Sequence, residues 1–208
     1  LESVYSLKES ASWLVLGQGP MPASAQDYEA LLRSVRENSP AGAESMARTV
    51  FKSSACSLEE SRLNGAVCLV KTGEELEAFY SSFSQIIGDE KVRRKILDEE
   101  ISLTRLPRWG ALADDMIDVR SLVEIINAHS VNNSMNALPE LNSFMHEVFS
   151  TSDRATGISI YYPADCASFK TIRDEYASLD FSRATHGAWL ELLDSRCGDD
   201  GDDQFSSR

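Results

Sequence analysis

The chain has 208 residues, of which 42% are hydrophobic, and this length allows one substantial core or at most two small ones. The 33 acidic residues outnumber the 20 basic ones, and the resulting net charge of −13 argues against a nucleic acid partner, whose phosphates it would repel. No stretch reaches the roughly 18 apolar residues that a membrane helix needs, so no membrane partner is expected either.

The first quarter of the chain predicts a helix, a buried strand and two further helices. Residues 1–11 keep helical spacing, and because Leu1 already belongs to that pattern we expect this chain to continue a longer polypeptide upstream. The apolar run 13–16 predicts a strand that ends at the Gly and Pro residues of 17–20. Beyond it, a capping box at Ser24 and Asp27 opens a helix with a stripe of apolar residues, and a second helix follows; their expected inward residues are Tyr28, Leu31, Leu32, Val35, Met46, Ala47, Val50 and Phe51.

The middle of the chain predicts a short strand and several helices. Residues 66–70 form the strand, and a capping box at Thr72 and Glu75 opens a helix that Gly88 ends. Residues 89–108 are highly charged, which indicates either a solvated helix face or a processing site at the basic cluster Lys91, Arg93, Arg94 and Lys95. Two more helices fit residues 118–129 and 138–149.

The last quarter contains the clearest strand, because Ile158, Ile160 and Tyr162 alternate with polar or less apolar positions before Pro163. Helices follow with apolar faces at 169–176 and from about Ser182 to 193, and residues 198–208 form an acidic tail predicted to be disordered. Helices that separate short apolar strands predict an α/β fold with a largely parallel sheet. One domain is expected over residues 1–197.

The residues offer few candidates for chemistry. Cys166 follows the clearest strand and could act as a nucleophile with His186 or His129 as its base, although the neighbouring Asp165 opposes a thiolate. The remaining cysteines are scattered without C-x-x-C spacing, so no zinc site is expected and the pairing of the four stays open: Cys56, Cys68, Cys166 and Cys197. The motifs of serine hydrolases, phosphate loops and dinucleotide-binding folds are absent.

Two acidic and histidine features have ordinary structural explanations. Asp114, Asp115 and Asp118 could give oxygen ligands to calcium, but the chain lacks the glycine-centred loop of a calcium hand, and helix capping explains Asp118. His146 lies opposite the apolar stripe of its helix and is expected at the surface. No metal site is therefore predicted from the residues.

Three stretches resemble the clostripain family of cysteine peptidases (family C11, clan CD), which have a caspase-like three-layer α/β fold. The first is LESVYSLKESASWLVLG at residues 1–17, followed by Pro22 and by Gln26, Asp27 and Tyr28. The second is TGISIYYP at 156–163, with Tyr176, the LDFS sequence at 179–182 and Trp189 behind it. A weaker third match is Asp118 with Val119 and the helix that they begin.

The resemblance implies that this chain is the part of such a domain downstream of the catalytic cysteine. The nucleophilic Cys and the general-base His would lie upstream of Leu1, so the parent would be the enzyme and this chain alone would not. The resemblance implies hydrolysis of peptide bonds, typically after Arg or Lys, by a secreted or exported bacterial protein, with the upstream segment and a peptide or protein substrate as partners. It leaves room for calcium as a cofactor.

The resemblance places the wall of the substrate cleft at Gly17, Gln18, Ser24 and Asp27. Gly17 and Gln18 replace the Ser-Glu pair common in the family, and Ser24 stands near an acidic position of some members. These departures leave open a catalytically dead pseudoenzyme or peptide-binding module as the alternative. A free-standing domain that uses Cys166 and His186 is the third reading.

Overall fold

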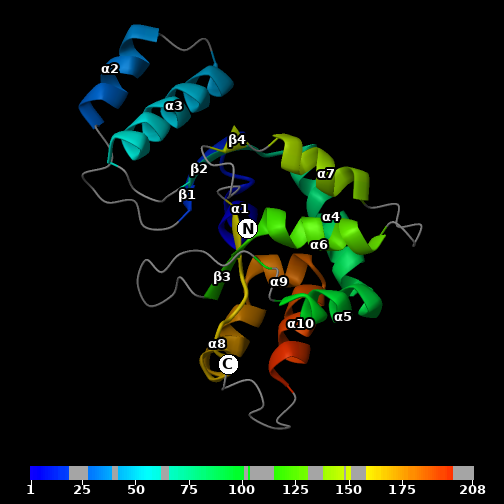
Figure 1. Cartoon of the computed structure of the whole chain (residues 1–208). Coiled ribbons are helices and arrows are strands. Elements are labelled where there is room, and N and C mark those ends of the chain that lie inside the picture. Colours follow the sequence, from blue (N-terminus) through cyan, green and yellow to red (C-terminus); the bar gives the residue numbers. More distant parts are fainter. Residues whose placement is uncertain are drawn as a thin grey trace.

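The computed structural model describes residues 1–18, 28–38, 42–61, 66–100, 103, 115–130, 138–147, 149–150 and 158–198. Helices dominate these residues, with short strands between them (Figure 1). The helices are α1 (Glu2–Leu7), α2 (Tyr28–Asn38), α3 (Ala43–Ser61), α4 (Glu74–Gly88), α5 (Glu90–Asp98), α6 (Val119–Ser130), α7 (Leu138–Glu147), α8 (Cys166–Ala177), α9 (Asp180–Ala184) and α10 (Ala188–Cys197). The strands are β1 (Trp13–Gln18), β2 (Ala66–Lys71), β3 (Met116–Asp118), β4 (Phe149–Ser150) and β5 (Ser159–Tyr161).

The strands form two small sheets in the described part of the chain. One sheet has the order β1-β2-β4, with β1 at its edge, and the other pairs β3 with β5. Each described pairing is antiparallel, with Trp13 opposite Lys71 in the first sheet and Met116 opposite Tyr161 in the second. The fold therefore mixes helices and strands as expected, but the described strands do not form the expected parallel sheet.

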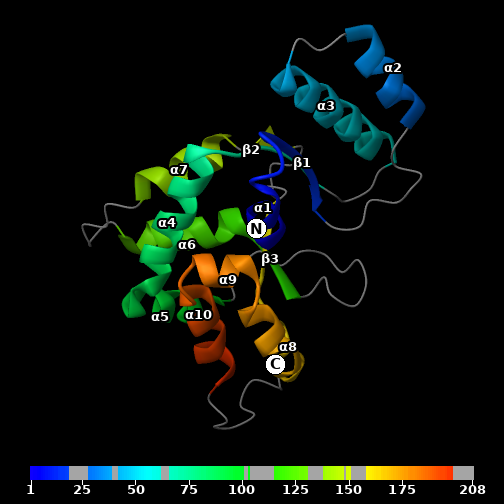
Figure 2. The ribbon, with the colours of Figure 1, turned by 180° about the vertical axis from the view of Figure 1, so that it is seen from behind.

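The core is built around α4, which lies between α7 and α10 in both views (Figures 1 and 2). The apolar stripe predicted for this helix is buried along its whole length: Leu76, Phe79, Tyr80, Phe83, Ile86 and Ile87. Phe79 meets Phe144 of α7 with ring centroids 4.4 Å apart, and Phe83 meets Trp189 of α10 at 5.7 Å. The aromatic face of α4 thus packs against both α7 and α10.

The predicted start of α4 is wrong in its chemistry. The N-cap of α4 is Gly73 with φ 121°, and no side chain caps the helix. The Thr72 hydroxyl instead donates to the carbonyl of Ala11, and Glu75 pairs with Lys71 at 3.1 Å. The capping box fails because Thr72 is nine-tenths buried against the segment before β1, where its hydroxyl finds a partner across the sheet.

Helices α2 and α3 form a hairpin that stands beside the rest of the molecule (Figures 1 and 2). The sequence assigns an inward stripe to both helices, but Tyr28 is 60% exposed, Leu32 69% and Met46 39%. Ala47 is buried, and Arg48 lies over the Trp13 ring of β1 at 5.8 Å. The periodicity predicts both helices correctly. It also predicts that their apolar side chains are buried, whereas several of these side chains are exposed in the described structure.

The charged stretch after α4 is a helix with a mostly solvated face. Asp89 caps α5 by accepting a hydrogen bond from the Lys91 amide at 2.7 Å, and Arg94 pairs with Glu90 within the helix. Arg93 reaches back to donate to the carbonyls of Ile87 and Gly88 at 3.0 and 2.9 Å, so it closes the end of α4. Residues 104–108 of the predicted charged segment lie outside the described residues.

The C-terminal region follows β5 with three helices. The alternation predicted around β5 is confirmed, because Ile158, Ile160 and Tyr162 are at most 2% exposed. The single helix expected from about Ser182 is wrong: α9 and α10 are separated by a turn in which His186 has φ 50° and Gly187 has φ 74°. The positive φ at Gly187 is inexpensive only for glycine. The predicted tail beyond Gly198 lies outside the described residues.

None of the helices in the described part has both the length and the apolar character of a membrane span. 

Alkaline pH should destabilise this core through one buried thiol. Burial raises the pKa of Cys68 on β2 to about 12 from an ordinary value of 9.0. A pKa raised by folding contributes stability that is present below pH 9 and is lost as the pH rises from 9 towards 12. We expect the free energy of unfolding to fall by about 1 kcal/mol between pH 9 and 10 through this group. Urea unfolding of the wild type and of Cys68→Ala at both pH values measures this loss. If the free energy of unfolding fell equally in the two proteins between pH 9 and 10, Cys68 would not be its cause.

Candidate functional site

The cleft residues expected from the resemblance begin at the end of an edge strand. Gly17 and Gln18 are the last two residues of β1, where they pair with Val67 and Ala66 of β2, and Gly17 is exposed. Ser24 and Asp27 lie outside the described residues. The structure therefore locates the start of the expected cleft wall and does not test whether the four residues meet.

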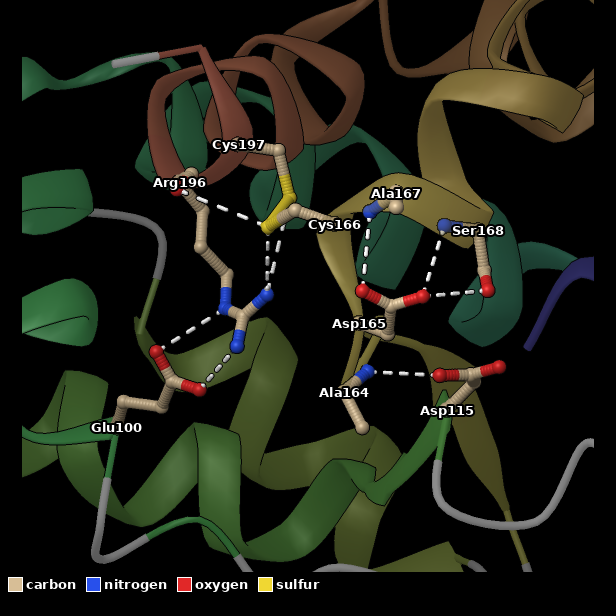
Figure 3. Close-up of a disulfide and its surroundings, with 9 residues drawn as sticks. All are labelled: Glu100, Asp115, Ala164, Asp165, Cys166, Ala167, Ser168, Arg196 and Cys197. Carbon is tan, nitrogen blue, oxygen red and sulfur yellow. Dashed lines mark hydrogen bonds and ion pairs between the residues drawn. A yellow bond between two sulfur atoms is a disulfide. The ribbon is translucent and has the colours of Figure 1, made fainter. Parts of the chain in front are cut away.

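Cys166 is not a free nucleophile in this structure. It forms a disulfide with Cys197, with 5.2 Å between the two Cα atoms (Figure 3). Because the thiolate is the nucleophilic form of cysteine, a sulfur held in a disulfide cannot attack a peptide carbonyl. The structure thus argues against the Cys166 peptidase centre and supplies one pairing that the sequence left open.

The histidines do not complete a site around Cys166. His186 lies in the turn between α9 and α10 and lines a cavity of about 370 Å³ together with Tyr5, Glu77 and Tyr80. Cys166 does not line this cavity. The side chains of His129 and His146 lie outside the described part, so the expectations for those two residues are not tested.

A buried arginine lies beside the disulfide, and sequence reasoning did not single it out. Arg196 of α10 makes a bidentate ion pair with Glu100, with Nε–Oε2 at 3.0 Å and Nη2–Oε1 at 2.6 Å. Its Nη1 lies 3.2 Å from the Cys166 sulfur and 3.7 Å from the Cys197 sulfur (Figure 3). The side chain is 13% exposed and the guanidinium lies over the Tyr162 ring at 4.9 Å.

The neighbours of Arg196 keep its guanidinium protonated. Burial by itself disfavours the cation, but the Glu100 carboxylate outweighs burial and raises the pKa of Arg196 above its ordinary value. Glu100 is 96 residues away in the chain, so no local spacing in the sequence indicates the pair. The result is a fixed cation in direct contact with two sulfur atoms.

Cys166 is also the first residue of α8, next to a well-formed cap. Asp165 accepts hydrogen bonds from the amides of Ala167 and Ser168 at 3.1 and 3.0 Å, and from the Ser168 hydroxyl at 2.7 Å. The Ser168 hydroxyl and these amides hold the pKa of Asp165 below its ordinary value. The carboxylate that the sequence places beside Cys166 is therefore committed to capping the helix.

The acidic residues considered for calcium have structural roles where they are described. Asp118 is 1% exposed and caps α6 by accepting from the Arg120 amide at 2.9 Å, which confirms the expected role. Asp115 accepts from the Ala164 amide at 2.7 Å, and Asp114 lies outside the described residues. In the part of the chain that the structure describes, no group of three or more His, Cys, Asp or Glu side chains is placed to hold a metal ion.

The first two stretches that carry the resemblance meet at the Glu2 carboxylate, and the third contacts the second. Oε1 of Glu2 accepts hydrogen bonds from the Tyr161 amide at 3.0 Å and the Tyr176 hydroxyl at 2.7 Å. Tyr161 in turn accepts at its carbonyl from Trp189 Nε1 at 3.0 Å. The third stretch joins through β3, where Asp118 pairs with Ser159 and the Val119 amide donates to the Ile158 carbonyl at 3.1 Å.

The electrostatics of this network favour an ionised Glu2. Burial raises the pKa of Glu2, but in this chain taken alone the amino group of Leu1 and the donors from Tyr161 and Tyr176 outweigh burial and leave the pKa below its ordinary value. Burial also raises the pKa of Tyr176 well above its ordinary value, so its phenol stays protonated and donates. The network thus joins segments more than 150 residues apart through a charged acceptor and neutral donors.

Comparison with known proteins adds no relative: no protein-family model, no curated protein and no solved structure matches this chain.

Proposed function

We propose that this chain is the downstream, non-nucleophile part of a clostripain-like cysteine endopeptidase, in which it contributes the scaffold and one wall of the substrate cleft. The upstream part of the parent would supply a thiolate that attacks the scissile carbonyl and an imidazole that transfers the proton to the leaving amine. The residues of this chain would bind and orient the peptide. The alternative is a pseudoenzyme or peptide-binding module with the same fold.

The observation that carries the proposal is the Glu2 network. The stretches that resemble the family lie far apart along the chain, yet Glu2, Tyr161, Tyr176 and Trp189 are linked by consecutive hydrogen bonds. Buried polar side chains need partners, and these residues satisfy one another. Their contact supports reading the first two stretches as one structural unit rather than as two chance matches.

The edge position of β1 leaves room for the proposed larger fold, whose parallel pairings would lie outside the described antiparallel ones. A caspase-like three-layer arrangement with a largely parallel sheet requires further strands beside those described, and β1 ends the order β1-β2-β4. An upstream strand could pair with the outer edge of β1, which would also protect that edge from association with other chains. In the proposed assembly the cleft wall starts where β1 ends.

The disulfide supports an exported parent. Disulfides persist in oxidising compartments such as the periplasm or the extracellular medium, whereas thiols are kept reduced in the cytosol. The Cys166–Cys197 bond therefore favours the secreted or exported location that the resemblance implies.

The test is peptidase activity of this chain alone and mixed with its upstream segment, on fluorogenic peptides with Arg, Lys or a neutral residue at P1. We expect activity only in the mixture, and its loss when the upstream segment is alkylated at its thiol. If the mixture hydrolysed none of the peptides, the pseudoenzyme would be favoured. Activity of this chain alone would contradict the proposal.

Restoring an acidic residue at the end of β1 should raise selectivity for basic P1 residues. Gln18→Glu is expected to raise kcat/KM for Arg and Lys peptides over neutral ones by about tenfold, because a charge-assisted hydrogen bond contributes roughly 1.5–3 kcal/mol. Gln85→Glu, at an exposed position of α4, adds the same charge away from β1 and is the matched control. Equal changes in the two variants would show that net charge alone is responsible, which would remove Gln18 from the cleft.

A further inference from the structure

We propose that Cys166 and Cys197 form a thiol–disulfide exchange site for small thiols of the glutathione class, with Arg196 as the cation that stabilises each departing thiolate. This proposal does not depend on peptidase function. It rests on the arrangement of both sulfurs, one guanidinium and one helix start in Figure 3.

The first observation is the position of the cation. Nη1 of Arg196 reaches both sulfurs, at 3.2 Å from Cys166 and 3.7 Å from Cys197, while its Nε and Nη2 are held by Glu100. A disulfide sulfur is uncharged and is only a weak acceptor. A thiolate at either position is a full anion, so the same contact becomes much stronger once the bond is cleaved.

The second observation is the start of α8. Cys166 is the first residue of this 12-residue helix, where the helix dipole favours negative charge. Asp165, directly before Cys166, is an opposing charge, and its two oxygens accept hydrogen bonds from Ala167 and Ser168. Cations and helix N-termini are the features that favour the thiolate of reactive cysteines.

Access selects the order of the steps. Cys166 is half-buried between the exposed residues Asp165 and Ala167, whereas Cys197 is only 6% exposed. An external thiolate therefore attacks the Cys166 sulfur, forming a mixed disulfide and releasing Cys197 as a thiolate near Nη1. A second external thiolate then attacks the external sulfur of the mixed disulfide and releases Cys166 as a thiolate.

The reaction balances with two thiols as the reductant. Two electrons pass from the two external thiols to the Cys166–Cys197 bond, the external thiols leave joined as their disulfide, and the protein sulfurs take up protons from the external thiols through solvent. The reverse reaction uses the external disulfide as the oxidant. In both directions each departing sulfur lies within reach of the Arg196 guanidinium.

The experiment equilibrates the full chain at pH 8 in glutathione buffers of graded ratio and measures the fraction of reduced Cys166 and Cys197 by differential alkylation and peptide mass spectrometry. Arg196→Gln should require about a tenfold higher ratio of reduced glutathione squared to oxidised glutathione for half-reduction, because the thiolates lose their cation. Glu100→Gln should shift the ratio in the opposite direction, because it removes an opposing charge.

Arg173→Gln is the matched control. Arg173 of α8 binds Asp194 of α10 at 2.7 and 2.6 Å, so it joins the same two helices as the disulfide, but its guanidinium binds carboxylates rather than sulfur. We expect its half-reduction ratio to stay within about twofold of the wild type, with circular dichroism confirming that each variant is folded. Equal shifts in Arg196→Gln and Arg173→Gln, or a wild-type bond that resists the most reducing buffer, would overturn the proposal and leave a purely structural disulfide.

Discussion

Trp189→Ala is expected to lower the free energy of unfolding by about 3–5 kcal/mol, the largest effect among the single substitutions considered. Trp189 is completely buried in α10, with its ring centroid 5.7 Å from that of Phe83 and 6.2 Å from that of Tyr162. Its removal leaves a large cavity between α4 and the strand that leads into α8, and it leaves the Tyr161 carbonyl without its indole donor. Chemical denaturation followed by circular dichroism measures the loss.

Two further substitutions separate the causes of this loss. Trp189→Phe keeps most of the aromatic volume and removes the donor, so it should cost about 1–2 kcal/mol. Leu190 is the next residue of α10 and is half-buried. Leu190→Ala should therefore lower the free energy of unfolding by about 1–3 kcal/mol, which is less than the loss expected for Trp189→Ala. If Trp189→Ala cost no more than Leu190→Ala, α10 would not be anchored in the core as the structure has it.

The parts of the fold that the sequence predicts well are those with strong local periodicity. The stripe of α4 places six apolar side chains on one face, and burial of that face follows almost directly from the spacing. The same holds for β5, where Ile158 and Ile160 alternate with Ser159, and for the cap at Asp118. In each case a short segment contains both the signal and its physical cause.

The parts that the sequence does not predict depend on partners far along the chain. An apolar run such as 66–70 predicts a strand but carries no information on its direction relative to β1, so the antiparallel pairing was missed. Thr72 has the spacing of a cap, but the carbonyl of Ala11, 61 residues away, takes its hydroxyl. The helix break at Gly187 had a local signal, because glycine tolerates the positive φ found there.

The candidate sites, too, depend on partners far along the chain. The chemistry at Cys166 could not be deduced locally, because its disulfide partner is 31 residues away and the Arg196–Glu100 pair spans 96 residues. The Glu2 network could be inferred only as three family-like stretches, since no spacing rule relates Glu2 to Tyr176. Of the residues that the resemblance singled out, Glu2, Tyr161, Tyr176 and Trp189 are linked by hydrogen bonds, whereas the cleft residues Ser24 and Asp27 lie outside the described part. The motif rules selected Cys166, which is already paired.

Glu2→Ala is expected to lower the free energy of unfolding by about 2–4 kcal/mol. The substitution removes the acceptor of the Tyr161 amide and of the Tyr176 hydroxyl, and Tyr176 is only 5% exposed. Hydrogen bonds to a charged group contribute about 1.5–3 kcal/mol each, and buried donors left unpaired add a desolvation cost. Glu9→Ala is the matched control, since the Glu9 side chain is 85% exposed in the turn after α1, and should change stability by no more than about 0.5 kcal/mol.

A double-mutant cycle and a pH series test whether the loss comes from the network. Tyr176→Phe should cost about 1–2 kcal/mol in the wild type and much less in Glu2→Ala, because the partner of its hydroxyl is already gone. The lowered pKa of Glu2 means that its contribution is complete above the ordinary value of 4.5 and is lost as the pH falls through the folded-state pKa. The stability difference between wild type and Glu2→Ala should therefore shrink from pH 6 to pH 3. Additive losses and a difference independent of pH would show that Glu2 acts by packing alone, and the link between the first two family-like stretches would then lose its main physical support.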